Sequence, residues 1–312
     1  MTPFPRRRLV VVVLIAACCA AIAAGAFWLS NGRTRLSPTM AFGGLVPRWA
    51  HPPKPTHVII VVEENKATES IIGSASAPYI NQLARQGAFF THASGVAHPS
   101  QPNYLALFAG VTNNDGDDCP EDSVPSSTPT LGGRLRAAGL SFSGYSEGMP
   151  AVGYTACRVE DQRHGYARKH NPWVNFDDVP SSENRPFTSL PMDYDKLPTV
   201  SFIIPSLAHD MHDGTIAQGD AWLREYIGPI VDWARTHDGL VVVTWDESDE
   251  QRTNHIPTIF IGQNVKPGRY DETITHYNVL RTIEDLYGLA PVGKSLLAAP
   301  IQDCWRQEQD SR

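Results

Sequence analysis

Cysteine and charge are both scarce in this chain of 312 residues, and each scarcity removes a class of function. The five cysteines include no Cys-x-x-Cys pair, so a cysteine-bound zinc site is not expected. Charged residues make up 19%, and the net charge of −7 lacks the basic excess of nucleic-acid-binding proteins. We therefore expect no nucleic acid among the partners. The hydrophobic fraction of 42% is that of an ordinary folded protein.

Long apolar runs are also missing, with one exception at the N-terminus. Three arginines precede 21 uncharged residues, 9–29, which is typical of an export signal or a membrane anchor. Residues 1–29 are thus predicted to be a signal peptide or N-terminal membrane anchor, and the small residues 24–26 favour cleavage. Either way, we expect the protein to be secreted or anchored on the outer face of the cytoplasmic membrane. It would contact the membrane only through this segment or a lipid substrate.

The cysteines outside that segment fit an oxidising compartment. Cys119, Cys157 and Cys304 would form one disulfide and leave one thiol. Cys119 and Cys157 both lie in polar, loop-like sequence, so we expect them to pair. Cys304 has no role that the sequence indicates, and the sequence leaves the oligomeric state open.

The remaining chain alternates between short apolar runs and helical patterns. A Pro- and Gly-rich stretch without periodicity, 30–56, is expected to be a tether. The patterns predict strands at 57–62, 140–145, 199–205, 239–245 and 256–262, and helices at 78–87, 97–110, 131–139, 218–237 and 276–288. This order predicts one α/β domain, 57–312, with a mainly parallel sheet covered by helices on both faces. Residues 146–197 lack periodicity and are typical of an active-site wall.

Polar side chains gather where the predicted strands end. In open α/β sheets, ligands bind at the carboxyl ends of the strands. The polar residues that follow strands, or that precede the helix within 97–110, are Glu63, Glu64, Asn65, Asp246, Glu247, His209, Asp210, His212, Asp213, His98 and Ser100. Each alone is an ordinary loop or cap residue, but their joint placement favours a site.

Ser100 has two interpretations. It stands two residues before Pro102 at a helix start, which is the usual place of a helix cap. It would equally suit a nucleophile at a helix N-terminus, where backbone N–H groups hold an oxyanion. Nearby carboxylates and an amide would bind Mg²⁺, Mn²⁺ or Ca²⁺, and with histidine also Zn²⁺ or iron. A metal beside Ser100 would lower the pKa of its hydroxyl, a combination suited to phosphoryl transfer.

Seven motifs follow one another along the chain: VVEENKATESIIG, HPSQPNYLALFAG, YARKHNPWVNF, DMHDGTIAQGDAWL, VVVTWDES, IPTIFIG and THYNVLRTIEDLYGL. In this order they resemble those of the bacterial phosphoesterase family. This family contains acid phosphatase A-type enzymes and phospholipases C and belongs to the alkaline-phosphatase superfamily. The resemblance covers about 57–289 and implies a three-layer α/β/α sandwich, so that 57–312 would be a phosphoesterase catalytic domain.

The resemblance also implies roles for individual residues. One divalent metal ion would be bound by Glu64, Asn65, Asp246 and Glu247, and also by Ser100, the expected nucleophile. His212 would exchange protons with the leaving group and with water. Phosphate would be held by His98, Asn103, Lys169, His170 and Asp213. Tyr104–Phe108 are expected to anchor the helix, and His276 either supports the site or packs.

The predicted function is an exported, metal-dependent acid phosphatase that hydrolyses phosphate monoesters through a phosphoserine. Small monoesters or phospholipid headgroups would be the substrates, and the resemblance implies phosphoinositides such as phosphatidylinositol 3-phosphate. Protonated His170 and His212 would help to hold phosphate at mildly acidic pH. The alternatives are a phospholipase C-type phosphodiesterase and a non-enzymatic cell-surface binding protein. Ser-Asp-Glu-Gln after the Asp246–Glu247 pair fits the monoesterase-like members better.

Overall fold

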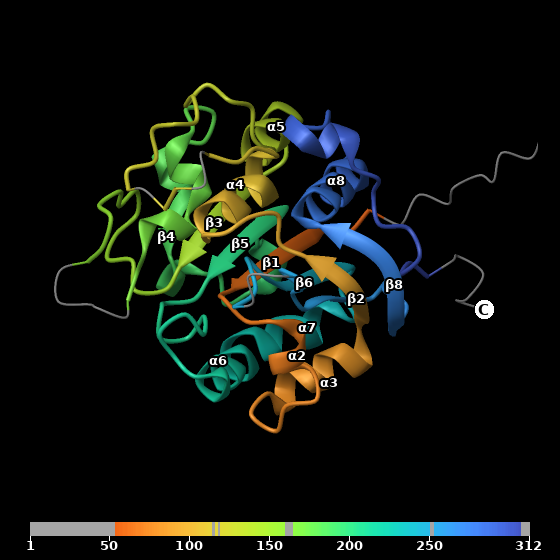
Figure 1. Ribbon diagram of the computed structural model, residues 1–312. Helices are drawn as coiled ribbons and strands as arrows, with labels where there is room; N and C mark the ends of the chain where they lie inside the picture. Colours follow the sequence, from red (N-terminus) through yellow and green to blue (C-terminus); the bar gives the residue numbers. More distant parts are fainter. Residues whose placement is uncertain (1–53, 114–115, 118, 160–164, 250–252, 307–312) are drawn as a thin grey trace, which may run out of the picture. The chain divides into compact units, whose positions relative to one another are not determined.

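A computed structural model describes residues 54–306, apart from 114–115, 118, 160–164 and 250–252 (Figure 1). The predicted signal peptide or anchor, 1–29, lies outside the described residues, as does the tether up to residue 53. Within the described part, no helix has both the length and the apolar character needed to cross a bilayer.

One mixed sheet of eight strands runs through the described part, in the order β4-β3-β5-β1-β6-β7-β2-β8. Five of its seven strand pairings are parallel, and β7 runs against both of its neighbours. The strands are β1 (His57–Glu63), β2 (Ala88–Ser94), β3 (Phe142–Ser146), β4 (Asn184–Pro186), β5 (Val200–Ile204), β6 (Gly239–Trp245), β7 (Thr258–Gly262) and β8 (Gly268–Thr275).

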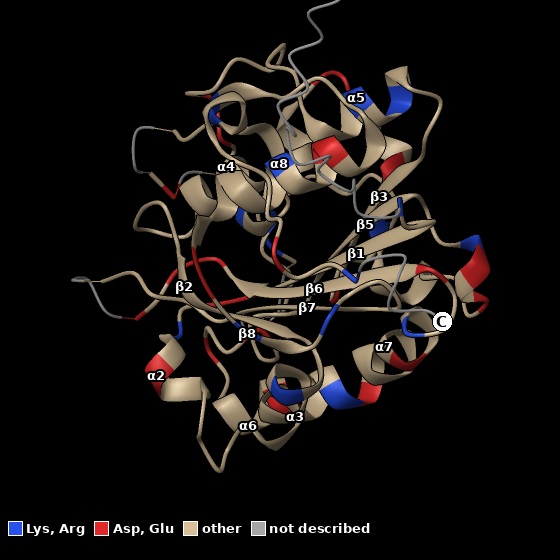
Figure 2. Cartoon of the chain, turned by 90° about the vertical axis from the view of Figure 1, so that its right-hand side faces the viewer, with Lys and Arg blue, Asp and Glu red and all other residues tan. Residues whose placement is uncertain are grey.

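Helices form a layer on each side of this sheet. Figure 2 shows α4, α5 and α8 on one face and α2, α3, α6 and α7 on the other. The predicted α/β/α sandwich with a mainly parallel sheet is therefore confirmed. The helices are α2 (Thr68–Ile71), α3 (Pro78–Gln86), α4 (Gln101–Ala109), α5 (Leu131–Ala137), α6 (Ile216–Trp222), α7 (Gly228–Ala234) and α8 (His276–Tyr287).

The central strands are those that the sequence predicts. All residues of β5 and β6 are buried, as is β1 after His57, because helices cover both faces of the sheet. A strand buried on both faces is largely apolar, which explains the runs that predicted these strands. The predicted strands at 57–62, 199–205 and 239–245 therefore match β1, β5 and β6 within one residue at each end.

Three strands were not predicted: β2, β4 and β8. In β8 the first six residues alternate between partly buried and exposed, and the strand lies at an edge of the sheet, so it shows no apolar run. β4 is a three-residue strand at the other edge, inside the predicted irregular stretch. The described residues of that stretch otherwise contain five short 3₁₀ turns, η1 (Arg168–His170), η2 (Pro172–Asn175), η3 (Ser181–Glu183), η4 (Phe187–Ser189) and η5 (Tyr194–Lys196).

The single helix predicted at 218–237 is interrupted. A π-helical segment, η6 (Leu223–Ile227), separates α6 from α7. Pro229 lies in the first turn of α7 and has no N–H to continue an α-helical ladder. A π-turn absorbs this break without ending the helix.

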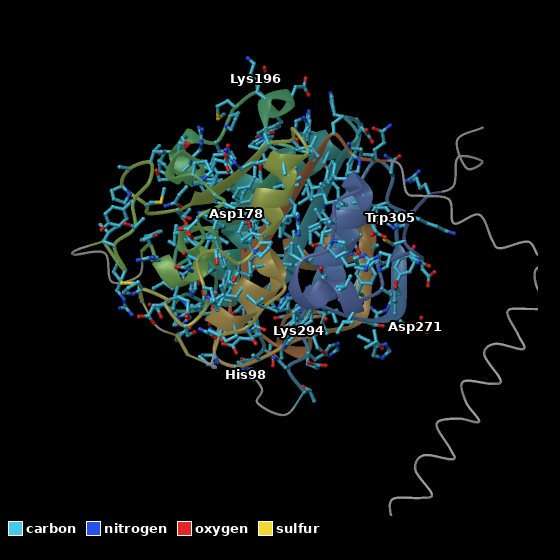
Figure 3. The ribbon with its side chains drawn as sticks, turned by 90° about the horizontal axis from the view of Figure 1, so that it is seen from above. His98, Asp178, Lys196, Asp271, Lys294 and Trp305 are labelled. Carbon is cyan, nitrogen blue, oxygen red and sulfur yellow. A yellow bond between two sulfur atoms is a disulfide. The ribbon has the colours of Figure 1, made fainter. Side chains whose placement is uncertain are left out.

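The parallel strands bring their carboxyl ends to one edge of the sheet. Glu64, Asp246 and Asp210 follow β1, β6 and β5, and β2 leads to the loop that begins α4. Figure 3 shows His98, from this loop, on the opposite side of the domain from Lys196, which precedes β5.

Helix α4 is buried on every side, from Gln101 to Ala109. Its end depends on Gly110, which has a φ of 67°. A Cβ at this position would lie 2.2 Å from the carbonyl oxygen of Val292, so the chain here has room only for glycine. The helix is thereby fixed in place, and with it the position of its N-terminus.

The predicted disulfide is confirmed. Cys119 and Cys157 are joined, with 5.7 Å between their Cα atoms, and link the loop after α4 to the long irregular stretch. Cys304 is a buried free thiol.

Glu284, on α8, gives the fold a pH dependence that one substitution should remove. Burial raises the pKa of this carboxyl to about 7, above the value of an unfolded chain. Because the folded state keeps a proton that the unfolded state loses, stability should fall as pH rises from about 4.5 to 7. We expect the free energy of unfolding of the wild type to decrease by about 2–3 kcal/mol over this range, and that of Glu284→Gln to show no such decrease.

Urea unfolding of both proteins at pH 4.5 and 7.5 measures the difference. Glu225→Gln, at an exposed position in η6 on the opposite side of the sheet, is the control and should behave as the wild type does. Equal pH dependence in Glu284→Gln and wild type would show that folding does not raise the pKa of Glu284.

Candidate active site at the carboxyl edge of the sheet

The carboxylate of Glu64 is the centre of the polar cluster. Glu64 directly follows β1 and is fully buried. Its Oε2 accepts hydrogen bonds from Asn65 Nδ2, at 2.9 Å, and from the Ser100 hydroxyl, at 3.1 Å. Its Oε1 accepts one from the Tyr104 hydroxyl and lies 3.1 Å from His170 Nε2. One side chain thus connects four others that come from three parts of the sequence.

Ser100 does not cap α4. Its backbone is already helical, with φ −56° and ψ −52°, and its side chain makes no capping bond to the helix. The hydroxyl instead lies 3.1 Å from Glu64 Oε2 and 3.1 Å from Glu247 Oε1. The cap interpretation of Ser100 is therefore wrong, and its oxygen is free of the backbone and sits between two carboxylates.

Asp246 and Glu247 follow β6 and close the cluster from the other side. Asp246 Oδ1 accepts a hydrogen bond from the backbone N–H of Asn65, at 3.1 Å, and Asp246 Oδ2 has no hydrogen-bond partner in the described part of the chain. Glu247 Oε2 contacts His98 Nδ1. His276 Nε2 lies 2.6 Å from the backbone carbonyl oxygen of Asp246, so this histidine supports the site.

Asp210 and His170 complete the cluster beside Glu64. Each of these three buried residues offers one ligand atom, and the three atoms lie within 4.8 Å of one another. Asp210 also shapes its loop, because its carbonyl accepts the Glu64 N–H at 2.7 Å and its Oδ1 accepts the His212 N–H at 2.8 Å. Met211, between them, has a φ of 77°, which is unusual for a side chain of this size.

Burial makes these acids hard to ionise. Burial first, and then the charge of Asp246, raises the pKa of Glu64 well above its usual range, and burial does the same for Asp210. Burial and the charge of Glu247 raise the pKa of Asp246 to about 7, and burial raises that of Glu247 to about 7. A bound cation would offset both burial and mutual repulsion, as it does in protein metal sites generally.

The residues present fit a divalent metal ion. The donors are carboxylate oxygens, an amide and one imidazole, and they include Asp246 Oδ2, a buried oxygen for which the described residues show no hydrogen-bond partner. Such a set suits Mg²⁺, Mn²⁺ or Ca²⁺, and the imidazole admits Zn²⁺ or iron. The group formed by Glu64, His170 and Asp210 could hold a metal.

The surroundings of His170 favour a neutral ring over the predicted protonated one. Burial, and then the charge of Lys169, lowers the pKa of His170 well below its usual value. The ring is stacked on Tyr104, with 4.9 Å between centroids and 11° between planes. A neutral imidazole fits a metal ligand better than it fits a cation that holds phosphate.

The other predicted phosphate ligands contact neighbouring acids or support the loop ahead of Ser100. His212 Nδ1 is 2.7 Å from Asp213 Oδ1, and its ring centroid is 6.3 Å from that of His170. Lys169 pairs with Asp117. Asn103 Oδ1 accepts the backbone N–H groups of 96 and 97, at 2.8 Å and 3.1 Å, so this side chain holds the loop ahead of Ser100.

Two residues of the cluster were not assigned from the sequence. Asp210 is among the polar residues that follow a predicted strand, but nothing in the sequence shows which acid of that loop turns inward. Tyr104 was expected only to pack. Its spacing of four from Ser100 was the available signal, because residues four apart lie on one face of a helix.

Comparison with known proteins gives consistent results. Residues 74–290 match the model of the Phosphoesterase family. A phosphatidylinositol-3-phosphatase of Mycobacterium tuberculosis is 51% identical over 252 residues, covering 80% of this chain and 82% of that protein. An acid phosphatase of Aspergillus fumigatus is 31% identical, covering 68% of this chain and 51% of that protein. This chain therefore spans about half the length of the fungal relative.

Solved structures confirm the fold. A protein of the alkaline phosphatase superfamily from Vibrio parahaemolyticus superposes with a TM-score of 0.54 at 14% identity, covering 80% of this chain and 72% of that one. At this identity the likeness concerns the architecture alone. It agrees with the α/β/α sandwich of Figure 2.

Replacement of the central carboxylate should abolish most metal binding. Glu64→Gln keeps the size of the side chain but removes the charge that Ser100, Tyr104 and His170 surround. We expect the affinity for Mn²⁺, measured by calorimetric titration of chelator-treated protein, to fall by on the order of a hundredfold. Asp178→Asn is the matched control, since Asp178 accepts its bonds from Thr130 near α5. Unchanged affinity in Glu64→Gln would exclude Glu64 as a ligand.

Proposed function

The chain belongs to the Phosphoesterase family and is a phosphoric monoester hydrolase, and from this premise we propose that it is an exported, metal-dependent phosphatase that works through a phosphoserine at Ser100. The observation that supports this proposal most directly is the position of the Ser100 hydroxyl. It precedes α4, lies between Glu64 and Glu247, and makes no capping bond that would occupy it.

Ser100 would attack phosphorus, and its hydroxyl proton would pass to one of the two neighbouring carboxylates. Both oxygens lie at 3.1 Å, within direct proton-transfer distance. The start of α4 would offer the entering phosphate the backbone N–H of Gln101, which here donates to Asp117 Oδ1. The apolar body of the helix, buried throughout, holds this geometry.

The metal would be held by Glu64, Asn65, Asp246, Glu247 and Ser100, with Asp210 and His170 adjoining through Glu64. When bound, the ion supplies positive charge that favours the alkoxide of Ser100 and offsets charge on phosphate. Tyr104 keeps its proton, because burial and the nearby Glu64 charge raise its pKa well above the usual value, and so it donates to Glu64 throughout.

His212 is the proposed proton donor to the leaving alkoxide. It is one-third exposed, and its Nδ1 contact with Asp213 leaves Nε2 for proton transfer. In the second half of the reaction the same nitrogen would accept a proton from the water that hydrolyses the phosphoserine.

Phosphoinositides are the proposed class of physiological substrate. The support is the 51% identical relative, which is named a phosphatidylinositol-3-phosphatase. Export is supported by the arginine-led apolar segment 9–29 and by the disulfide between Cys119 and Cys157, since such bonds persist in oxidising compartments. The protein would thus act outside the cytoplasm, released or held by its N-terminal segment.

Ser100→Ala should lose at least about a thousandfold in kcat for p-nitrophenyl phosphate, because the attacking oxygen is removed. Its Mn²⁺ content should stay at about the wild-type level, since carboxylates supply most of the ligands. Ser201→Ala is the control: Ser201 is equally buried, on β5, and its hydroxyl has no described partner. Full activity in Ser100→Ala would rule out this serine as the nucleophile.

The reaction class is tested by a substrate panel before and after treatment with a chelator. We expect phosphate release from p-nitrophenyl phosphate and phosphatidylinositol 3-phosphate, loss of that activity on chelation, and recovery with one divalent metal. Hydrolysis of p-nitrophenylphosphorylcholine faster than of the monoester would instead indicate a phospholipase C-type diesterase. Metal binding without hydrolysis of any ester would indicate a binding protein.

A further inference from the structure

An acidic side chain, Asp117, bonds to the start of α4 next to Ser100. Asp117 lies in the loop after α4, two residues before the disulfide-bonded Cys119. Its Oδ1 accepts the backbone N–H of Gln101, at 3.1 Å, and its Oδ2 pairs with Lys169 Nζ. Gln101 is the first residue of α4 and the neighbour of Ser100. The Asp117 carboxylate therefore bridges the start of the helix and the nearest lysine.

These two donors are the ones that a phosphate on Ser100 would meet. A helix N-terminus and a lysine are both typical phosphate ligands. Lys169 is only 17% exposed, and its charge lowers the pKa of Glu64 and of Asp210 against the larger effect of burial. The Asp117 charge adds to burial in raising the pKa of Glu247, which contacts Ser100. Both members of the pair therefore act on the same site.

We propose that Asp117 is an internal anion that occupies the phosphate subsite and competes there with substrate and with product phosphate. This inference rests on the proposed phosphatase function. Two anions cannot share the Gln101 N–H and the Lys169 ammonium, so the carboxylate must leave these donors when phosphate binds. Breaking the contacts of Asp117 costs free energy, and this cost weakens the binding of phosphate. Product phosphate should therefore inhibit the enzyme less than it would without Asp117, although the site presents a metal, a lysine and a helix N-terminus to phosphate.

The test is the inhibition constant of inorganic phosphate against p-nitrophenyl phosphate, in metal-saturated protein at one pH. Asp117→Asn can still accept the Gln101 N–H but carries no charge to hold Lys169. We expect the inhibition constant and KM to fall together by roughly threefold to tenfold. Asp122→Asn, an exposed acid of the same loop for which the described residues show no ion pair, should match the wild type.

A change of the inhibition constant in the opposite direction would overturn the proposal. If Asp117 merely positions Lys169 for phosphate, Asp117→Asn will raise the inhibition constant, as Lys169→Met should in either case. An unchanged constant would equally exclude competition. Asp117→Ser, with its shorter neutral side chain, repeats the test, and thermal unfolding verifies that each variant is folded.

Failure of this inference can be told apart from failure of the proposed function. Calorimetric titration of the metal-loaded protein with inorganic phosphate measures affinity without any turnover. If the wild type hydrolyses no phosphate ester, the proposed function fails. If the wild type is active and Asp117→Asn binds phosphate no more tightly, only the role of Asp117 fails.

Discussion

The buried carboxylate of Glu64 is the interaction on which the rest of the site depends. A charge with no exposed surface is costly unless partners surround it. Here Asn65, Ser100, Tyr104 and His170 all contact its two oxygens. They arrive from the end of β1, from α4 and from the irregular stretch before β5, so one acid determines how three separate segments must pack. A cation bound beside Glu64 would offset the remaining cost of burying its negative charge.

Helix α4 shows how this requirement is met. Ser100 and Tyr104 are four residues apart, and their hydroxyls reach different oxygens of the same carboxylate. The helix between and beyond them is apolar and buried on all sides, and Gly110 closes it against the carbonyl of Val292. A helix that is fixed along its whole length accurately positions Ser100, the residue just before it, and the backbone N–H of Gln101, its first residue. Packing and catalysis therefore both depend on this helix.

The sequence predicts those parts of the structure that depend on local pattern. The strands β1, β5 and β6 are apolar because both of their faces are covered, and the acids that follow β1 and β6 are correctly placed together with Ser100. The strands β2, β4 and β8 escaped prediction, and β4 and β8 are the edges of the sheet, where burial is incomplete. Pairing of Cys119 with Cys157 was predicted from their polar surroundings alone.

What the sequence could not predict depends on tertiary burial and on backbone turns. The inward direction of Asp210 follows from a loop in which Met211 adopts a φ of 77°, and no residue type signals that turn. The lowered pKa of His170 follows from its burial against Tyr104 and Glu64, which joins segments far apart in the chain. Asn103 was expected at the phosphate but bonds to the loop before Ser100, a structural task that uses the same side-chain chemistry.

The central claim is that Ser100 becomes covalently phosphorylated during turnover. Mixing the metal-loaded protein with excess monoester, quenching in acid within milliseconds and mapping phosphate by peptide mass spectrometry tests it directly. The account predicts phosphate on Ser100, appearing in the first turnover and decaying when substrate is exhausted. Phosphate found on another residue, or product formed in the first turnover with no phosphorylated peptide, would contradict it.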